Sequence, residues 1–154
     1  MYKKVSTDMN FVDREKQIEK FWDDNHIFEK SMEEREGCPD YIFYDGPPTA
    51  NGKPHIGHVL TRVIKDMIPR YRTMKGSMVP RKAGWDTHGL PVELEVEKLL
   101  GLDGKDQIEE YGLEPFIDKC KESVWKYKGM WEDFSRTVGF WADMDNPYVT
   151  YDDN

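Results

Sequence analysis

The sequence contains few cysteines, no long apolar segment and no apolar stretch behind its first lysines. Cys38 and Cys120 are the only cysteines among 154 residues, and they lie outside the spacing of a metal site. No apolar run approaches the length of a membrane span, and the start of the chain lacks the apolar core of a secretory signal. These absences favour reduced thiols, a cytoplasmic location, no zinc site in this chain and no membrane partner.

The sequence also lacks an excess of basic residues. It has 22 Lys and Arg against 30 Asp and Glu, which gives a net charge of −8. A protein that binds nucleic acid by itself normally has a basic surface, so the charge argues against that class. It does not exclude an enzyme whose RNA-binding surface lies elsewhere.

Residues 11–36 are predicted to form a helix and its exit. Asp13 can serve as the N-cap, and Ile18, Phe21 and Trp22 fall on one helical face. The run of aromatic and branched residues at 40–45 then predicts a strand that is buried on both faces.

A turn and a long helix follow this strand. Residues 46–54 are rich in Gly and Pro and cannot be helical. Apolar residues then recur at steps of three and four, which predicts a helix that Pro69 kinks and Gly76 ends. These apolar residues are Ile56, Val59, Leu60, Val63, Ile64, Met67, Ile68 and Tyr71. An extended piece at 78–86 completes a strand–helix–strand unit, so we expect an α/β fold with a parallel, doubly wound sheet.

The rest of the chain is predicted to be mostly helical. Pro91 suits a first helical turn, and an apolar stripe at helical spacing indicates packing rather than a cofactor site. The stripe consists of Phe116, Cys120, Val124, Tyr127, Trp131, Phe134 and Val138. The acidic tail from Asp143 is rich in turn formers and adds no strand. Only two strands are then expected, which are too few for a stable sheet layer.

Two histidines mark the point where the Gly/Pro-rich turn passes into the helix. The first amides of a helix lack intrahelical partners and, with the helix dipole, suit a phosphate group. His55 and His58 lie three apart on the first turn, where their rings can donate to phosphate oxygens. Gly57 lets a flat ring or a sugar approach the backbone. The alternative from the residues alone is a chance pair of surface histidines.

Asp86 is expected at the carboxyl end of a strand, where doubly wound sheets bind their ligands. A carboxylate there can pair with an ammonium group, and such a charge-assisted contact is strong. The alternative is an aspartate that caps a turn, because Thr87 and Gly89 lie beside it. We expect Trp85 to pack beneath the site, Lys53 to be solvated and His88 to have a structural role.

The segments at 47–58 and 84–93 resemble two sequence elements of one enzyme family. His55-Ile56-Gly57-His58 matches the first signature of class I aminoacyl-tRNA synthetases, known as the HIGH motif. Small nucleotidyltransferases share those four residues, but Gly84-Trp85-Asp86-Thr87-His88-Gly89 is similar to an element of the isoleucyl family. The resemblance runs from Val5 to Tyr148.

The resemblance implies a Rossmann-like fold and a two-step reaction. Isoleucine would attack Mg-ATP to give isoleucyl-adenylate, and tRNA(Ile), bound mostly outside this chain, would take the acyl group. It implies His55 and His58 as catalytic residues that stabilise the transition state rather than abstract a proton. The implied ATP-binding residues are Thr49, Asn51, Gly52, His55, Gly57 and His58, the implied amino-acid-binding residues are Gly46, Pro47 and Asp86, and no metal ligand is implied.

The family's second signature, a K-M-S-K-S loop, is missing from the sequence. We therefore expect a fragment with half of an adenylation site, unable to complete aminoacylation alone. Its parts would be an N-terminal helical extension at 1–39, the first half of the catalytic domain at 40–112, and a helical extension at 113–154 leading to missing domains. Two other hypotheses are a non-catalytic, synthetase-like binding module and a small nucleotidyltransferase of the HIGH type.

Overall fold

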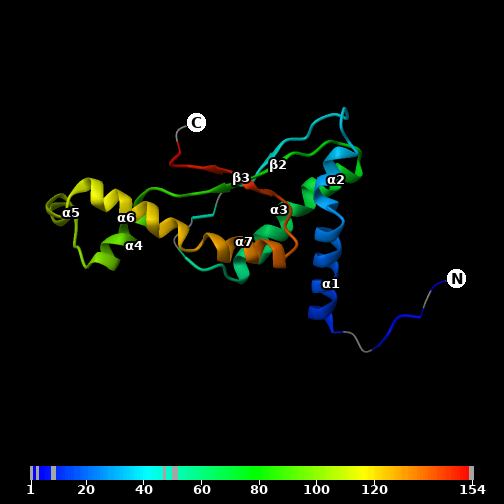
Figure 1. Cartoon of the computed structure of the whole chain (residues 1–154), viewed down its shortest axis with the longest axis horizontal. Helices are drawn as coiled ribbons and strands as arrows, with labels where there is room; N and C mark the ends of the chain where they lie inside the picture. The colour runs from blue at the N-terminus through cyan, green and yellow to red at the C-terminus, as the bar shows by residue number, and fades with distance from the viewer. Residues whose placement is uncertain (1, 3, 8–9, 47, 50–51, 153–154) are drawn as a thin grey trace.

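The computed structural model describes residues 2, 4–7, 10–46, 48–49 and 52–152. Within these ranges, three parallel strands form one sheet in the order β1-β2-β3 (Figure 1). The strands are β1 (Phe43–Tyr44), β2 (Arg81–Trp85) and β3 (Asp143–Val149). The helices are α1 (Phe11–Asp24), α2 (Ile27–Glu33), α3 (Ile56–Met74), α4 (Leu90–Leu100), α5 (Lys105–Tyr111), α6 (Leu113–Trp125) and α7 (Lys128–Thr137). The predicted α/β class is confirmed.

The strand–helix–strand unit predicted from the sequence is present as β1, α3 and β2. Phe43 pairs with Arg81 and Tyr44 with Lys82, so the two strands are parallel. Pro69 lies inside α3, which continues to Met74. Gly76 follows with φ +91°, a left-handed conformation that ends the helix as predicted.

The prediction that the tail adds no strand was wrong. Residues 143–149 form β3, which pairs with β2 through Lys82 with Asp143 and Trp85 with Val149. The register shifts between these pairs. Asp143 Oδ1 accepts hydrogen bonds from the backbone N–H groups of Asp145 and Asn146, so a turn is built into the strand. The turn formers therefore mark an irregularity in a strand, which continues in the aromatic and branched residues from Tyr148.

Two helical predictions need correction at their ends. The helix expected over 11–36 is divided, because Asn25 caps α1 and His26 takes a left-handed conformation with φ 50° before α2. Asn10, not Asp13, is the N-cap of α1, since its Oδ1 accepts from the N–H groups of Val12 and Asp13.

The apolar stripe after residue 113 spans two helices, α6 and α7, and it is packing as predicted. One core cluster joins β2, β3, α4, α6 and α7 through Trp85, Val92, Val124, Trp131 and Val149. Trp85 is buried in this cluster, so it packs in the core as predicted. Pro91 lies in the first turn of α4, as expected.

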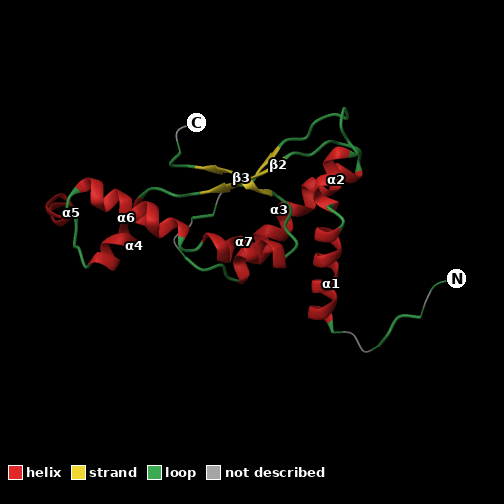
Figure 2. Ribbon diagram, in the orientation of Figure 1, coloured by secondary structure: helices red, strands yellow, loops and turns green. Residues whose placement is uncertain are grey.

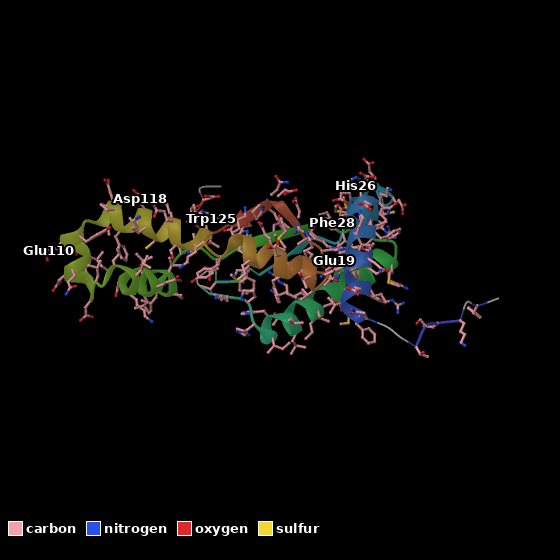
Figure 3. The ribbon with its side chains drawn as sticks, turned by 60° about the horizontal axis from the view of Figure 1, so that its bottom comes forward. Glu19, His26, Phe28, Glu110, Asp118 and Trp125 are labelled. Carbon is pink, nitrogen blue, oxygen red and sulfur yellow. The ribbon has the colours of Figure 1, made fainter. Side chains whose placement is uncertain are left out.

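In Figure 2, α4, α5 and α6 lie toward the left of the molecule and α1 and α2 toward the right, with the strands between them. In the same view α3 and α7 lie below the strands. Figure 3 shows Glu110 and Asp118 at one end of the molecule, Glu19 and His26 at the opposite end, and Trp125 between them. Within the described part of the chain, no helix has the length and apolar character needed to cross a membrane.

Two predicted apolar faces are not covered. Ile42 and Tyr44, beside and in β1, are 64% and 63% exposed, so the strand is not buried on both faces. The stripe along α3 is also open, whereas polar Arg62 and Thr73 are buried on this helix. Its exposed members include Ile56, Leu60, Val63, Ile64, Met67, Ile68 and Tyr71, and Met74 at the end of the helix extends the exposed face. The reason is that α3 directs its polar face to the sheet and loop, and no other described element packs on its apolar face.

Candidate functional site

The candidate residues lie in the loop between β1 and α3 and at the end of β2. Because β1 and β2 are parallel, their carboxyl ends meet at the same edge of the sheet. That edge is where open α/β sheets bind ligands. The same edge also receives the end of β3, where Thr150 N donates to Trp85 O at 3.2 Å.

A buried ion pair fixes the start of the loop. The Asp45 carboxylate, 1% exposed, contacts Arg62 Nη1 at 2.5 Å and Lys65 Nζ at 2.7 Å. Lys65 Nζ also donates to the carbonyl oxygen of Gly46 at 3.0 Å. Gly46, a predicted amino-acid-binding residue, is therefore held against the middle of α3. The sequence analysis missed this anchor, although a carboxylate that ends a strand ahead of a helix with basic residues was a visible signal.

His55 and His58 form a reciprocal cap at the start of α3. His55 is the N-cap, and its Nδ1 accepts from Gly57 N–H at 3.1 Å. His58 Nδ1 accepts from His55 N–H at 3.0 Å. The expectation that these first amides are free for phosphate is corrected, because the imidazoles already occupy two of them.

The capping geometry determines where these rings can donate. Each Nδ1 accepts a hydrogen bond, so each neutral ring carries its proton on Nε2. Among the described residues neither Nε2 has a hydrogen-bond partner. The two ring centroids are 3.8 Å apart, so the two Nε2–H donors belong to adjacent rings. The predicted pair is therefore brought together. The donors it offers to a ligand are the two Nε2–H groups and not the capped backbone amides.

The surroundings of His58 favour its neutral form. Burial lowers its pKa from the ordinary value of 6.5, and the charges of His55 and Arg62 lower it further. Near pH 7 the ring is thus uncharged, as its acceptor role in the cap requires.

Gly57 is needed by the His55 ring itself. A Cβ atom at position 57 would lie 3.0 Å from His55 Cε1 and 3.1 Å from its Nδ1. Such contacts are tighter than ordinary van der Waals packing, so a side chain here would displace the capping ring. This differs from the expectation that the glycine makes room for a ligand ring or sugar.

Trp131 connects the histidine pair to the core. Its ring meets His58 edge-on at a centroid distance of 4.7 Å, and its Nε1 donates to Gly52 O at 2.9 Å. The sequence analysis placed Trp131 in a packing stripe and missed this contact with the loop. Gly52, a predicted ATP-binding residue, is held by it.

Thr49 and Asp86 form a second group. Thr49 Oγ1 donates to Asp86 Oδ2 at 3.2 Å, and the two residues form an isolated parallel bridge. Within the described ranges no basic side chain forms an ion pair with Asp86. Its partly buried carboxylate is thus available to an external cation. Asp86 lies at the end of β2 as predicted, and the contact with Thr49 was not foreseen.

Two predicted residues, Pro47 and Asn51, lie outside the described residues. Lys53 is exposed, as expected for a solvated lysine. His88 is also exposed, and its Nδ1 lies 2.6 Å from Thr150 Oγ1. Among the residues that the structure describes, no group of three or more His, Cys, Asp or Glu side chains could hold a metal ion.

Among the described residues, one cavity lies away from the candidate residues and another reaches their edge. One, of about 990 Å³, lies between α1–α2 and the strands, and it includes none of the predicted site residues. The other, of about 540 Å³, lies among α4, α5 and α6 and reaches Thr87 and His88.

Comparison with known proteins gives a consistent result. The family profile described as tRNA synthetases class I (I, L, M and V) matches residues 17–154. The chain is 63% identical over 151 residues to isoleucine–tRNA ligase of Clostridium novyi (strain NT), covering 98% of this chain and 14% of that protein. It is 63% identical over 154 residues to isoleucine–tRNA ligase of Clostridium kluyveri, covering 100% of this chain and 15% of that protein.

A solved structure has a similar fold. The ternary complex of Agrobacterium radiobacter K84 agnB2 LeuRS-tRNA-LeuAMS matches with a TM-score of 0.62 and 20% sequence identity. The match covers 90% of this chain and 16% of that chain. It supports the Rossmann-like arrangement of strands and helices.

The chain spans about one seventh of the length of the curated relatives, which are 14% and 15% covered.

Proposed function

Because the chain belongs to the class I tRNA synthetases of the isoleucine, leucine, methionine and valine group, we propose that it carries half of a site that forms isoleucyl-adenylate. Isoleucine is the proposed amino acid because relatives that are 60–63% identical are isoleucine–tRNA ligases. ATP, with the Mg²⁺ that its phosphates carry, is the proposed second substrate. tRNA(Ile) is the proposed acyl acceptor, held mostly by regions beyond these residues, in the cytoplasm.

The observation that carries the proposal is the paired imidazole cap at the start of α3. Its two rings accept backbone N–H groups through Nδ1, so both Nε2–H groups can donate outward. N–H donors at that position can bind phosphate oxygens and stabilise the charge that grows as the amino-acid carboxylate attacks the α-phosphorus. The reaction needs no base, since the carboxylate is already a nucleophile.

Asp86 is proposed to hold the ammonium group of the amino acid. Its carboxylate accepts from Thr49 and has no basic partner among the described residues, so an ammonium group can complete its contacts. Gly46 and Pro47 are proposed to lie along the amino acid. Thr49, Asn51, Gly52 and Gly57 are proposed to contact ATP or support the loop around it.

The division of the chain stays part of the proposal. Residues 40–112 would supply the first half of the catalytic domain, with helical extensions at 1–39 and 113–154. The shared core of Trp85, Val92, Val124 and Trp131 shows that residues from the second and third of these segments pack together. The second half of the site would come from the part of the relatives that this chain does not match.

A chimera tests the proposal in a complete enzyme. The matched segment of the Clostridium novyi relative is replaced by this chain, and isoleucine-dependent exchange of pyrophosphate into ATP is measured. We expect the chimera to be active and Asp86→Ala to raise the KM for isoleucine at least tenfold, because an ionic contact is lost. Lys53→Ala, at an exposed lysine, is the matched control and should behave as the parent chimera. An inactive parent chimera that is folded would contradict the proposal.

A further inference from the structure

A hydrogen-bonded cluster joins the ends of β2 and β3 just beyond Asp86. The Thr87 N–H group donates to Thr150 Oγ1 at 3.0 Å, and the two threonine hydroxyl oxygens are 3.1 Å apart. Tyr151 N–H donates to Thr87 Oγ1 at 3.2 Å, and His88 Nδ1 lies 2.6 Å from Thr150 Oγ1. Figure 1 shows β2 and β3 side by side where they lead into these residues.

Burial decides which groups of this cluster donate a hydrogen bond and which accept one. Thr87 is 3% exposed, so its hydroxyl proton needs an acceptor within the protein. Among the described residues that acceptor is Thr150 Oγ1. Thr150 Oγ1 then accepts from both the N–H and the hydroxyl of Thr87, which fills its two lone pairs. Its own proton must therefore go to the remaining neighbour, His88 Nδ1.

A ring that accepts at Nδ1 carries its proton on Nε2 when it is neutral. His88 is exposed, and its Nε2 has no hydrogen-bond partner within the described part of the chain. The cluster thus presents an oriented N–H donor to solvent at the carboxyl end of the sheet. If His88 Nδ1–H instead donated to Thr150 and Thr150 donated to Thr87, the buried Thr87 hydroxyl would have no acceptor. Leaving a buried donor unpaired costs more free energy than one hydrogen bond contributes.

The position of His88 relates it to Asp86. The two residues flank Thr87, which is buried, while Asp86 is partly buried and His88 exposed. β2 ends at Trp85, and Asp86 still forms a parallel bridge with Thr49 just beyond it. Where a chain stays extended, residues two apart face the same side and lie about 6.6 Å apart. An anionic acceptor and an N–H donor are then both available to one small zwitterion, whose ammonium would go to Asp86 and whose carboxyl oxygen to His88.

We propose that Thr87 and Thr150 are positioning residues that hold His88 as an Nε2–H donor for a carboxyl oxygen of the amino-acid substrate. The identity of that acceptor rests on the proposed function. The direction of the relay, meaning the hydrogen bonds that run from Thr87 through Thr150 to His88, does not.

Ring nitrogen NMR on the 154-residue chain tests the relay without any ligand. We expect His88 to be the Nε2–H tautomer in the wild-type chain and in Thr150→Ser, which keeps the hydroxyl. Thr150→Val keeps the shape but removes the donor, and should lower the ratio of Nε2–H to Nδ1–H tautomer about tenfold. An Nδ1–H tautomer in the wild-type chain overturns the proposal, as does an unchanged ratio in folded Thr150→Val. If Thr150→Val does not fold, the wild-type tautomer alone decides the direction.

Kinetics of the chimera test whether His88 donates to the carboxyl group of isoleucine. His88→Phe keeps a ring without the donor and should raise the KM for isoleucine about tenfold while kcat changes little. His88→Gln places an amide N–H near the position of Nε2 and should recover most of this loss. An unchanged KM in His88→Phe overturns the carboxyl contact. An inactive parent chimera counts against the proposed function instead, and the ring measurement still decides the relay.

Discussion

At the level of single residues, His58 makes a hydrogen bond that needs a neutral ring, because its Nδ1 accepts from His55 N–H. The ring also makes a T-shaped contact with Trp131. Sequence reasoning could pair His58 with His55 because a spacing of three residues places both on one helical turn. It could not show that each ring closes onto a backbone amide, because this depends on side-chain rotamers that no spacing reveals.

The lowered pKa of His58 predicts a pH dependence of stability. Burial, then the charges of His55 and Arg62, lower the pKa in the folded chain, and unfolding restores the ordinary value of 6.5. The unfolded chain therefore binds more protons below about pH 6.5, and the folded state loses stability as the pH falls through that region. His58→Gln keeps a side chain suited to the third position of a capping box and removes this titration.

Urea unfolding measured near about pH 7.5 and about pH 5.5 checks the prediction. We expect acidification to lower the free energy of unfolding more in the wild-type chain than in His58→Gln. The comparison cancels the titration of the carboxylates common to both proteins. Equal losses in the two proteins would contradict a lowered pKa for His58.

At the level of the elements, α3 is tied to the loop by charge. The Asp45 carboxylate is 1% exposed and the Arg62 side chain 5% exposed, whereas Lys65 is 37% exposed. Removing one partner of a buried pair leaves the other charge unpaired in a poorly solvated site. Removing a half-exposed lysine leaves the buried pair intact.

We therefore expect Asp45→Ala to lower the free energy of unfolding by about 3 kcal/mol. Lys65→Met is the matched control and should cost about 1 kcal/mol or less. Urea unfolding of both variants measures the difference. A similar small loss in both would mean that the Asp45–Arg62 contact does not anchor the loop.

The elements show which sequence patterns are reliable. The apolar residues at steps of three and four predicted α3, and the extended segment after that helix predicted β2. Both predictions were right because side-chain spacing follows backbone geometry directly. β3 was missed because Asp143, Asn146 and Pro147 are turn formers, and Asp143 does form a turn with Asp145 and Asn146 within the strand. Only Tyr148-Val149-Thr150 indicated extended structure, and its pairing with β2 is a long-range contact.

At the level of the whole molecule, α3 carries an uncovered apolar stripe. Leu60, Met67 and Met74 are 62%, 61% and 82% exposed and lie on the face opposite buried Arg62 and Thr73. Contiguous apolar patches of this kind promote association in water. The period of three and four predicted the helix correctly, but it could not tell that the apolar face lies away from the sheet.

We expect the isolated chain to self-associate through this stripe. Leu60→Lys should shift the chain to monomer in sedimentation velocity, because a charge interrupts the patch. Leu113→Lys makes the same chemical change at a leucine of similar exposure, 61%, on α6 and should leave association unchanged. If both variants associate like the wild-type chain, the stripe is not the contact surface.

The candidate site could be predicted only in part, because several of its residues are far apart in the sequence. Motif and strand order placed His55, His58 and Asp86 at one edge of the sheet. The supporting residues Asp45, Arg62, Trp131 and Thr150 are 17 to 79 residues from their partners in the sequence, so only the fold brings them there.

Binding of a stable adenylate analogue to the chain tests the central claim most directly. Calorimetry with 5′-O-(N-isoleucylsulfamoyl)adenosine would compare the wild-type chain with His58→Ala and Asp86→Ala. The account predicts that the wild-type chain binds and that each substitution weakens binding at least tenfold, since each removes a direct polar contact to a charged ligand. No binding by the folded wild-type chain, or equal binding by all three proteins, would contradict it.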